Sequence, residues 1–460
     1  MPRQWVRLGK IERAWAFTAL LAAAATTLSA QTTPASATRS SQPVRGTAPQ
    51  ETLRAGFSVE RLRRVDALLE RYVDENRIAG AVALVLRDGQ PVYEKAVGWA
   101  DREANRRMSP DTIFRIASQT KAITSAGILA LAEEGLLGIN DPVSRFIAAY
   151  AKTTVAARND SGVTTVPAKR PITIKDLLTH TAGISYGTQP DIAPLYEAKG
   201  LGPAAGFGWY TADKDEGVCD TMERLASVPF TAQPGEAWVY GYNTDILGCV
   251  IENASGMTLD AYLRTRIIEP LGMKDTTFFL PTDKKDRLAA VYRIADGKLV
   301  RAQEGPRGQG HYVEGPRRNF AGGAGLLSTA GDYSRFLEMI RNGGALNGVR
   351  VLSPRTVALM THNQIGSLHS PNGLGFGLGF ETTDLVGANG LDPAGAFGWG
   401  GAYGSMYRVD PSANVAILLM IQMLPQTSDL GPRYLTAVYQ ALVLDSVGAG
   451  PRQSTGNPQP

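Results

Sequence analysis

Short strand-like runs lie near both ends of this 460-residue chain, and they constrain its fold more than any other feature. Residues 81–86 and 91–97 form one pair of runs, joined through Asp88-Gly89, which is typical of a hairpin turn. Residues 403–409 and 415–423 form a second pair, and the later run is rich in Val, Ile and Leu, as in a central strand. The sequence therefore predicts a sheet layer built from both ends of the chain.

Helical patterns accompany both pairs of strands. Apolar residues recur at helical spacing over residues 59–73 and again over about 431–446. The stretch of about 140–325 reads as mostly helical and rich in loops. We therefore expect an α+β fold in which a largely helical region is inserted into the sheet layer. With 43% hydrophobic and 20% charged residues, the composition is that of an ordinary globular protein.

The first thirty residues predict export. Four basic residues precede an apolar run over 14–28, which ends in the small residues of Leu28-Ser29-Ala30. This layout is typical of a secretory signal peptide, cleaved after Ala30 or, as a second choice, after Ala37. The run is shorter than the roughly 20 apolar residues that span a membrane, and no later segment is long and apolar enough. We expect a periplasmic or secreted protein without a membrane span.

Both ends of the chain differ in composition from its middle. Residues 31–50 are rich in Thr, Ser, Pro and Gln and predict a disordered linker, and residues 447–460 predict a matching tail, which leaves a folded domain over 51–446. Residues 1–30 hold four basic groups and one acidic group, so their removal lowers the net charge from +4 to +1. A nearly neutral protein has no broad electrostatic footprint for nucleic acid or anionic lipid.

Two cysteines, Cys219 and Cys249, leave two alternatives open. An exported protein meets an oxidising compartment, in which a disulfide between them can form. Cys249 lies within residues 245–252, however, which read as a buried helix, and a free cysteine packed as a small hydrophobe fits there at least as well. The histidines at 180, 311, 362 and 369 show no paired ligand spacing, so we expect neither a metal nor another cofactor.

Ser118-Gln119-Thr120-Lys121 opens a long apolar helical pattern that stops at Gly135. Residues three apart on a helix share a face, so the serine hydroxyl and the lysine amine come within contact range. Because the surrounding residues are mostly Ala, Ile and Leu, desolvation favours a neutral amine that can act as a base for the hydroxyl. The helix N-terminus also offers N–H groups to an oxyanion. The tetrapeptide is common, however, so this hypothesis depends on partners elsewhere.

Two glycine-containing segments predict turns. Residues 177–183 predict a helix that ends in a turn at Gly183. His180, within this segment, has the residue type of a general base, but a hydrogen-bonded histidine that holds the turn is the stronger interpretation. Residues 322–325 lack the Gly-Lys that follows in a phosphate-binding loop, so they also predict a plain turn.

Tyr240 lies on a loop between the Pro234-Gly235 turn and the helix that contains Cys249. A tyrosine close to a lysine ionises more readily and can carry a proton between a nucleophile and a leaving group. Taken alone, the segment would be interpreted as an aromatic plug over the core. Residues 397–404 are rich in glycine, which lets the backbone approach a ligand closely, so a strand-edge N–H there could complete an oxyanion hole.

These segments, in this order, resemble the serine β-lactamase and penicillin-binding-protein superfamily, and most closely the class C β-lactamase-related hydrolases that include the family VIII carboxylesterases. Ser118-x-x-Lys121 is similar to the nucleophile motif, and residues 178–183 are similar to a family signature. Tyr240 takes the place of the catalytic tyrosine, and Trp399-Gly400-Gly401 takes that of the Lys-Thr-Gly strand motif. The resemblance covers about 55–445 and implies a β-lactamase-like fold with an antiparallel sheet flanked by helices.

Two departures from the lactamase pattern bear on the substrate. Class C β-lactamases carry Tyr-x-Asn, whereas the second residue after Tyr240 is Tyr242; taking Tyr242 as the catalytic tyrosine would put Thr244 at that place. We prefer Tyr240, since its spacing to the following Asp-x-Leu-Gly fits the esterase-like branch. Trp399 stands where the lactamases hold a cation, so a contact with a substrate carboxylate is lost and an apolar wall is gained.

The resemblance implies an exported serine hydrolase that cleaves carboxylic esters through an acyl-enzyme. Ser118 attacks the ester, and Lys121 and Tyr240 act as a coupled base, with Tyr240 returning the proton to the leaving alcohol. Backbone N–H groups of Ser118 and Ala402 hold the oxyanion. The residues expected to contact the substrate are Trp399, Gly400, Gly401, Tyr242 and Tyr403.

Two other functions stay open at this point. A β-lactamase or D-amino-acid peptide hydrolase would use the same chemistry on a β-lactam or a cell-wall peptide, although the missing asparagine and cation argue against efficient lactam turnover. A non-catalytic scaffold or binding protein would keep the fold, but it has no need for Ser118, Lys121 and Tyr240 together.

Overall fold

The computed structural model describes residues 51–159, 162–202, 214–303 and 310–444. The predicted signal peptide (1–30), linker (31–50) and tail (447–460) lie outside these residues. The described residues belong to one structural unit that begins at Glu51. Among them, no helix combines the length and the apolar character that a membrane crossing requires.

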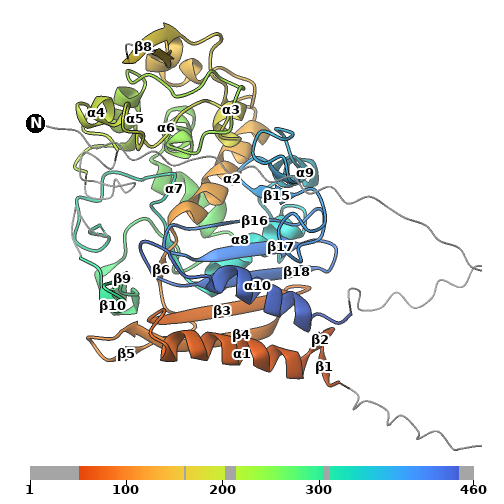
Figure 1. Cartoon of the computed structure of the whole chain (residues 1–460). Helices are drawn as coiled ribbons and strands as arrows, with labels where there is room; N and C mark the ends of the chain where they lie inside the picture. Colours follow the sequence, from red (N-terminus) through yellow and green to blue (C-terminus); the bar gives the residue numbers. More distant parts are fainter. Residues whose placement is uncertain (1–50, 160–161, 203–213, 304–309, 445–460) are drawn as a thin grey trace, which may run out of the picture. The chain divides into compact units, whose positions relative to one another are not determined.

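Eight antiparallel strands form the central sheet, in the order β14-β15-β16-β17-β18-β3-β4-β5 (Figure 1). Their bounds are Gly80–Arg87 (β3), Gln90–Asp101 (β4), Arg106–Arg107 (β5), Leu374–Phe376 (β14), Glu381–Thr383 (β15), Phe397–Gly400 (β16), Met406–Asp410 (β17) and Val415–Met420 (β18). Strand β18, from the C-terminal part of the chain, pairs with β3, from the N-terminal part. The sheet is therefore built from both ends of the chain, as the sequence predicts.

The turns at the strand ends follow the glycines of the sequence. Between β3 and β4, Asp88 and Gly89 have φ angles of 50° and 75°, as a two-residue hairpin turn requires. Strand β17 begins at Met406, later than the expected 403, because the preceding residues form a tight turn. In this turn the N–H of Gly401 donates to the carbonyl oxygen of Ser405 at 2.7 Å.

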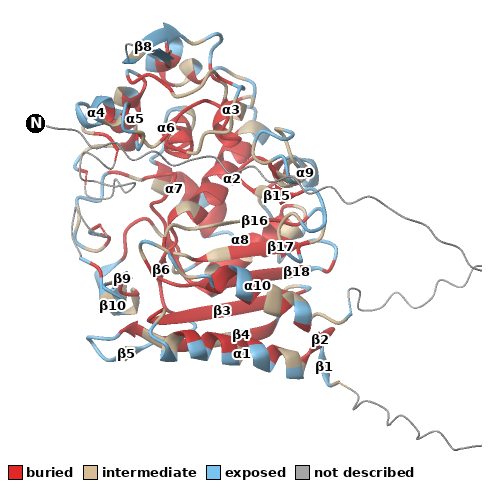
Figure 2. Ribbon diagram, viewed as in Figure 1, coloured by how far each residue is buried: buried red, intermediate tan, exposed pale blue. Residues whose placement is uncertain are grey.

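The two faces of the sheet carry separate apolar cores. Along β3, Leu84 belongs to the core on one face and Val85 to the core on the other, as strand alternation demands. Helices α1 (Val59–Asp74) and α10 (Leu430–Ala441) contribute to the core that includes Val85, and α8 (Ala330–Arg341) contributes to the core that includes Leu84. Strands β3 and β18, which lie between these two cores, are drawn as buried along their length (Figure 2). Both helices predicted beside the strand pairs are present.

The stretch between the two parts of the sheet is helical with small strand pairs. Besides α8, the α-helices described between β5 and β14 are α2 (Thr120–Glu133), α3 (Ile174–Leu178), α4 (Ala193–Glu197), α5 (Val218–Leu225), α6 (Asn243–Ser255), α7 (Leu259–Leu263) and α9 (Pro354–Thr361). Short pairs are formed by β1 (Leu53–Arg54) with β2 (Phe57–Ser58), β6 (Phe114–Arg115) with β11 (Leu327–Ser328), β7 (Thr154–Asn159) with β8 (Gly162–Pro167), β9 (Tyr292–Ala295) with β10 (Lys298–Arg301), and β12 (Ala345–Leu346) with β13 (Val349–Arg350). The expected helical region therefore also contains β-hairpins.

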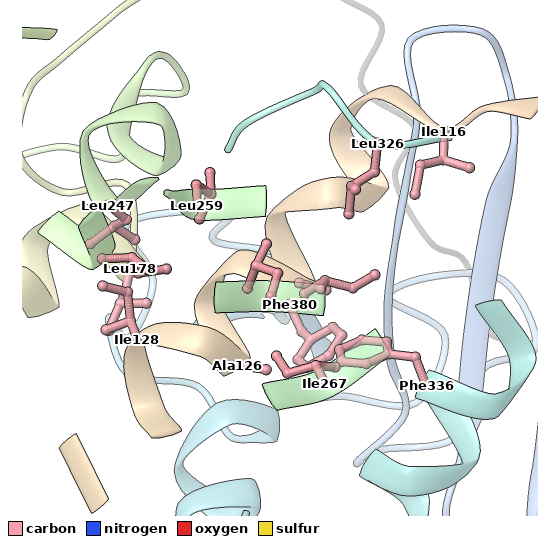
Figure 3. Close-up of a cluster of buried hydrophobic side chains, with 14 of the residues drawn as sticks. Ile116, Ala126, Ile128, Leu178, Leu247, Leu259, Ile267, Leu326, Phe336 and Phe380 are labelled. Carbon is pink, nitrogen blue, oxygen red and sulfur yellow. The ribbon is translucent and has the colours of Figure 1, made fainter. Parts of the chain in front are cut away.

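Helix α2 runs through the middle of the larger core, and nearly all of its residues are buried. Ile128 of α2 belongs to the same cluster of buried side chains as Leu247 and Leu259 (Figure 3). At Gly127 a β-carbon would lie 2.7 Å from a methyl carbon of Leu263, so glycine allows this close approach. This packing fixes α2, and with it the residues at its N-terminus.

A disulfide joins Cys219 on α5 to Cys249 on α6. The structure thereby decides between the two alternatives that the sequence left open, since Cys249 is both buried and paired. The free-cysteine interpretation is wrong, because α5 and α6 pack side by side and bring the two cysteines together. The expected burial of Cys249 gave no information on this packing.

Candidate active site

Ser118 lies on a short 3-10 turn, Ala117–Gln119, between β6 and α2. The sequence predicted the start of a helix here, and the structure places the serine one turn before the α-helix proper. Ala117 has a φ of 44°, a left-handed conformation that is uncommon outside glycine. Ser118 is partly exposed while the residues on either side of it are buried. The turn thus presents the hydroxyl to a cavity and keeps its neighbours in the core.

Lys121 is 2% exposed and makes three hydrogen bonds. Its Nζ donates to Ser118 Oγ at 3.3 Å, to the Tyr186 hydroxyl at 3.0 Å and to the carbonyl oxygen of Gly323 at 2.7 Å. The same nitrogen lies 4.7 Å from the ring centroid of Tyr240. The predicted proximity of serine, lysine and tyrosine is therefore present, and the lysine is poised to exchange a proton with the serine.

Tyr186 is a site residue that the sequence interpretation missed. It follows directly on the turn of residues 177–183, but 65 residues separate it from Lys121. Its ring packs edge-on against Tyr240 and Tyr242, with centroids 5.6 Å and 4.8 Å apart. The available signal was an aromatic hydroxyl next to a family-like turn, and only the folded chain brings it to the lysine.

Tyr240 is half-buried, and its hydroxyl accepts a hydrogen bond from Trp399 Nε1 at 3.2 Å. Tyr242 lies deeper and is 2% exposed, packed between Tyr186 and Tyr196. Burial raises the pKa of Tyr242 above its usual range, so its hydroxyl stays protonated. Of the two tyrosines that the sequence left as candidates, Tyr240 faces the cavity. Tyr242 does not line it, so the expected substrate contact of Tyr242 is not supported.

The end of strand β16 lies directly against the turn that carries Ser118. A β-carbon at Gly401 would be 2.5 Å from the carbonyl oxygen of Ile116, so only glycine lets the two backbones meet this closely. Gly400 and Ala402 line the same cavity as Ser118. Tyr403 does not line the cavity; it is fully buried in a small cluster with Ala117, which excludes the expected substrate contact.

The cavity has a volume of about 490 Å³ and a mostly apolar lining. The residues that line it are Ala117, Ser118, Tyr186, Tyr240, Ala324, Glu381, Asn389, Trp399, Gly400, Ala402, Met406, Tyr407, Arg408, Pro432 and Leu435. Along β16 and β17, Trp399 pairs with Tyr407 and Gly400 pairs with Met406. Side chains alternate across a sheet, so Trp399 and Met406 point to opposite faces. The cavity therefore extends from the Tyr240 side of β16 around Gly400 toward α10.

His180 holds the turn after α3, as the stronger of the two sequence interpretations predicts. It is buried, has a φ of 58°, and its Nδ1 lies 2.9 Å from the side-chain amide of Asn243. Burial, with smaller effects from the positive charges of Lys121 and His369, holds the pKa of His180 well below its usual value. Its ring packs 4.8 Å from that of Tyr240. The neutral His180 ring thus helps to hold the Tyr240 ring in place by packing against it.

The segment 322–325 forms the predicted turn and also holds Lys121. The carbonyl oxygen of Gly323 accepts a hydrogen bond from Lys121, and the N–H of Gly323 donates to Asp245 Oδ1 at 3.0 Å. Thr124 Oγ1 donates to the carbonyl oxygen of Gly322 at 2.9 Å. The turn is thus fixed between α2 and α6.

Comparisons with known proteins show the family to which this chain belongs. A family model described as Beta-lactamase matches residues 65–440. Esterase EstB from Burkholderia gladioli is 34% identical over 374 residues, which cover 78% of this chain and 89% of that protein. Lovastatin esterase from Penicillium rubens is 30% identical over 396 residues, covering 80% and 94%. The solved structure of EstCE1, described as a hydrolase with promiscuous acyltransferase activity, is 28% identical with a TM-score of 0.69, covering 83% of this chain and 98% of that one. The chain belongs to the beta-lactamase family, on its esterase-like branch.

Proposed function

We propose that this protein is an exported serine hydrolase that cleaves uncharged carboxylic esters through an acyl-enzyme on Ser118. The observation that carries the proposal is the Ser118–Lys121 contact at 3.3 Å in a mostly apolar cavity, with Tyr240 bonded to an indole N–H instead of a cation. Relatives named as esterases support a serine hydrolase of the carboxylesterase type.

The arrangement supports a two-step reaction. Ser118 Oγ attacks the carbonyl carbon while its proton passes to the Lys121–Tyr240 pair, and the N–H groups of Ser118 and Ala402 hold the oxyanion. When the tetrahedral intermediate collapses, the C–O bond to the alcohol breaks and Tyr240 returns the proton to that oxygen. Water then attacks the acyl-enzyme, gives its proton to the same pair and releases the acid, while Ser118 regains its proton.

The charges around the cavity favour a neutral substrate. Arg408 is the cation among the described residues that line the cavity. Its guanidinium forms ion pairs with Glu381 at 2.8 Å and Asp392 at 2.9 Å. These contacts leave it poorly placed to receive a substrate carboxylate, and Trp399 supplies no charge.

The shape of the cavity separates the two halves of an ester. Tyr240 and Trp399 lie on one face of β16, so the leaving alcohol belongs there, within reach of the Tyr240 hydroxyl. Met406 and Leu435 line the cavity on the side of α10 and supply an apolar wall for the acyl chain. We therefore assign the substrate as an ester of an apolar acid.

The decisive experiment compares p-nitrophenyl acyl esters of increasing chain length with a chromogenic cephalosporin. Wild-type protein should hydrolyse the esters much faster than the lactam, and Ser118→Ala should lose nearly all ester turnover. Ester turnover that survives Ser118→Ala would overturn the mechanism. Lactam turnover far above ester turnover would favour a β-lactamase or peptide hydrolase, and no turnover of either would favour a binding protein that keeps the fold.

Export is tested separately from activity. The full chain, produced in a Gram-negative host, should accumulate outside the cytoplasm with Gln31 as its first residue, because the predicted cleavage follows Ala30. Intact-mass measurement of the purified protein identifies the first residue. Retention of residues 1–30 in a cytoplasmic product would contradict export.

A further inference from the structure

Asp245 carries a buried carboxyl group, and the backbone of Gly323 links it to Lys121 through hydrogen bonds. It lies in the first turn of α6 and is 2% exposed. Its Oδ1 accepts the N–H of Gly323 at 3.0 Å, and the carbonyl oxygen of the same glycine accepts Lys121 Nζ at 2.7 Å. A β-carbon at Gly323 would lie 2.4 Å from Asp245 Oδ2, so only glycine lets the turn approach the carboxyl group this closely.

The groups that face Asp245 come from several elements. The positive charge of Lys121 on α2 lowers the pKa of Asp245. The negative charge of Asp245 in turn raises the pKa of the hydroxyl groups of Tyr242 and Tyr150. Burial raises the pKa of Asp245 to about 6, against the opposing effects of Lys121 and the Gly323 N–H. The carboxyl group therefore changes charge near pH 6.

We infer that Asp245 is a positioning residue that fixes Lys121 through Gly323 and sets how readily Lys121 gives up its proton. A buried carboxylate and a nearby ammonium stabilise each other, so an ionised Asp245 favours the charged form of Lys121 and weakens it as a base. A protonated Asp245 keeps the hydrogen bond to Gly323 but removes this charge. The inference rests on the proposed role of Lys121 as part of the base.

Asp245→Asn separates charge from geometry, because the amide oxygen still accepts the N–H of Gly323. The variant should shift the acid limb of the pH profile of kcat/KM to lower pH by about one unit, with the plateau changed less than threefold. Asp260→Asn is the matched control, since Asp260 is also a partly buried carboxyl group but lies on α7. A purely structural role for Asp245 would lower the whole profile without moving it, and that result would overturn the inference.

A second readout does not depend on ester turnover. The rate at which a neutral fluorophosphonate labels Ser118 reports activation of the serine at each pH, with Ser118→Ala as the blank. Asp245→Asn should move this labelling profile in the same direction and by the same amount. If labelling shifts but no ester is hydrolysed, the inference stands and the proposed ester substrate fails. If wild-type protein hydrolyses esters but neither profile shifts, the inference fails and the proposed function stands.

Infrared spectroscopy covers the case in which Asp245→Asn does not fold. The carbonyl stretches of protonated carboxyl groups are followed against pH, and the stretch whose midpoint responds to the charge of Lys121 is assigned to Asp245, because other buried carboxyl groups such as Asp260 and Asp332 also have raised pKa values. Lys121→Met removes the facing cation, so the midpoint should rise by about one pH unit. An unchanged midpoint would show that the two groups are not coupled and would overturn the inference.

Discussion

Tyr240 receives a hydrogen bond from the indole of Trp399, at the place where the lactamases that this chain resembles hold a cation. An N–H that points at a tyrosine oxygen supplies a hydrogen bond to that oxygen without adding a charge to the cavity. One residue can thus support proton transfer and, at the same time, disfavour anionic substrates. Tyr240 is also packed by His180 and by Trp238, whose ring stacks at 5.6 Å.

Trp399→Phe tests the indole hydrogen bond. The ring remains, but the donor to Tyr240 is lost, so kcat for p-nitrophenyl butyrate should fall about 5- to 10-fold, the value of one hydrogen bond in the transition state. Trp238→Phe is the matched control, because Trp238 stacks on Tyr240 but is not its hydrogen-bond donor. Equal effects in both variants would mean that Trp399 acts only by packing.

His180 predicts a pH dependence of stability. Its pKa in the fold is held well below the usual value by burial, so the folded protein keeps it neutral while the unfolded chain takes up a proton below about pH 6.5. The contribution of His180 to stability should therefore fall by about 2 kcal/mol as the pH drops from 7.5 to 5.

Urea unfolding at the two pH values measures this contribution. His180→Gln should flatten the dependence, whereas His362→Gln, which replaces an exposed histidine, should leave it unchanged. Equal loss of stability between pH 7.5 and pH 5 in wild type and His180→Gln would refute the expectation.

At the scale of elements, local patterns located most of the helices and strands near the site. The hairpin of β3 and β4, helices α1 and α10, and strand β18 lie where apolar spacing and the Asp88-Gly89 turn place them. The differences concern how elements end. Ser118 lies in a 3-10 turn ahead of α2, and β17 starts at Met406, after the tight turn in which Gly401 donates to Ser405 and lies against Ile116.

Gly401→Ala tests that contact. Its β-carbon would lie 2.5 Å from the Ile116 carbonyl oxygen, so the end of β16 must move away from Ser118 and take the N–H of Ala402 with it. A displacement of about 1 Å in an active site can cost about 100-fold in rate, so we expect kcat to fall about 100-fold. At the neighbouring Gly400 the β-carbon would lie 3.3 Å from the Ser405 carbonyl oxygen, so Gly400→Ala should cost much less. Steady-state kinetics on one ester compares the two, and equal losses would contradict the proposed role of Gly401.

At the scale of the whole molecule, the cavity exists because the sheet, α10 and the inserted helices meet around one short strand. The glycines of β16 leave the face toward α10 open, while Trp399 closes the opposite face beside Tyr240. The serine comes from the 3-10 turn ahead of α2, the lysine from α2, the tyrosines from the inserted region and the apolar acyl wall from β17 and α10. None of these elements forms the cavity alone.

Leu435→Phe tests the acyl wall. A larger side chain on α10 should shorten the cavity, so the ratio of kcat/KM for p-nitrophenyl octanoate to that for the acetate should fall about 10-fold. Leu435→Ala should raise the same ratio, and thermal unfolding of both variants checks that each is folded. An unchanged ratio in both would place the acyl chain elsewhere in the cavity.

The sequence by itself determined the fold class, the positions of the main elements and a short set of chemical groups, Ser118, Lys121 and Tyr240, because such features depend on residues within a few positions of one another. The tertiary structure alone decided which groups share a space. It brought Tyr186 to Lys121, paired Cys219 with Cys249, and set Asp245 behind Gly323. It also buries Tyr242 and Tyr403 away from the cavity lining. These contacts join residues far apart along the chain, and they form only when helices and sheet pack, so no local pattern specifies them.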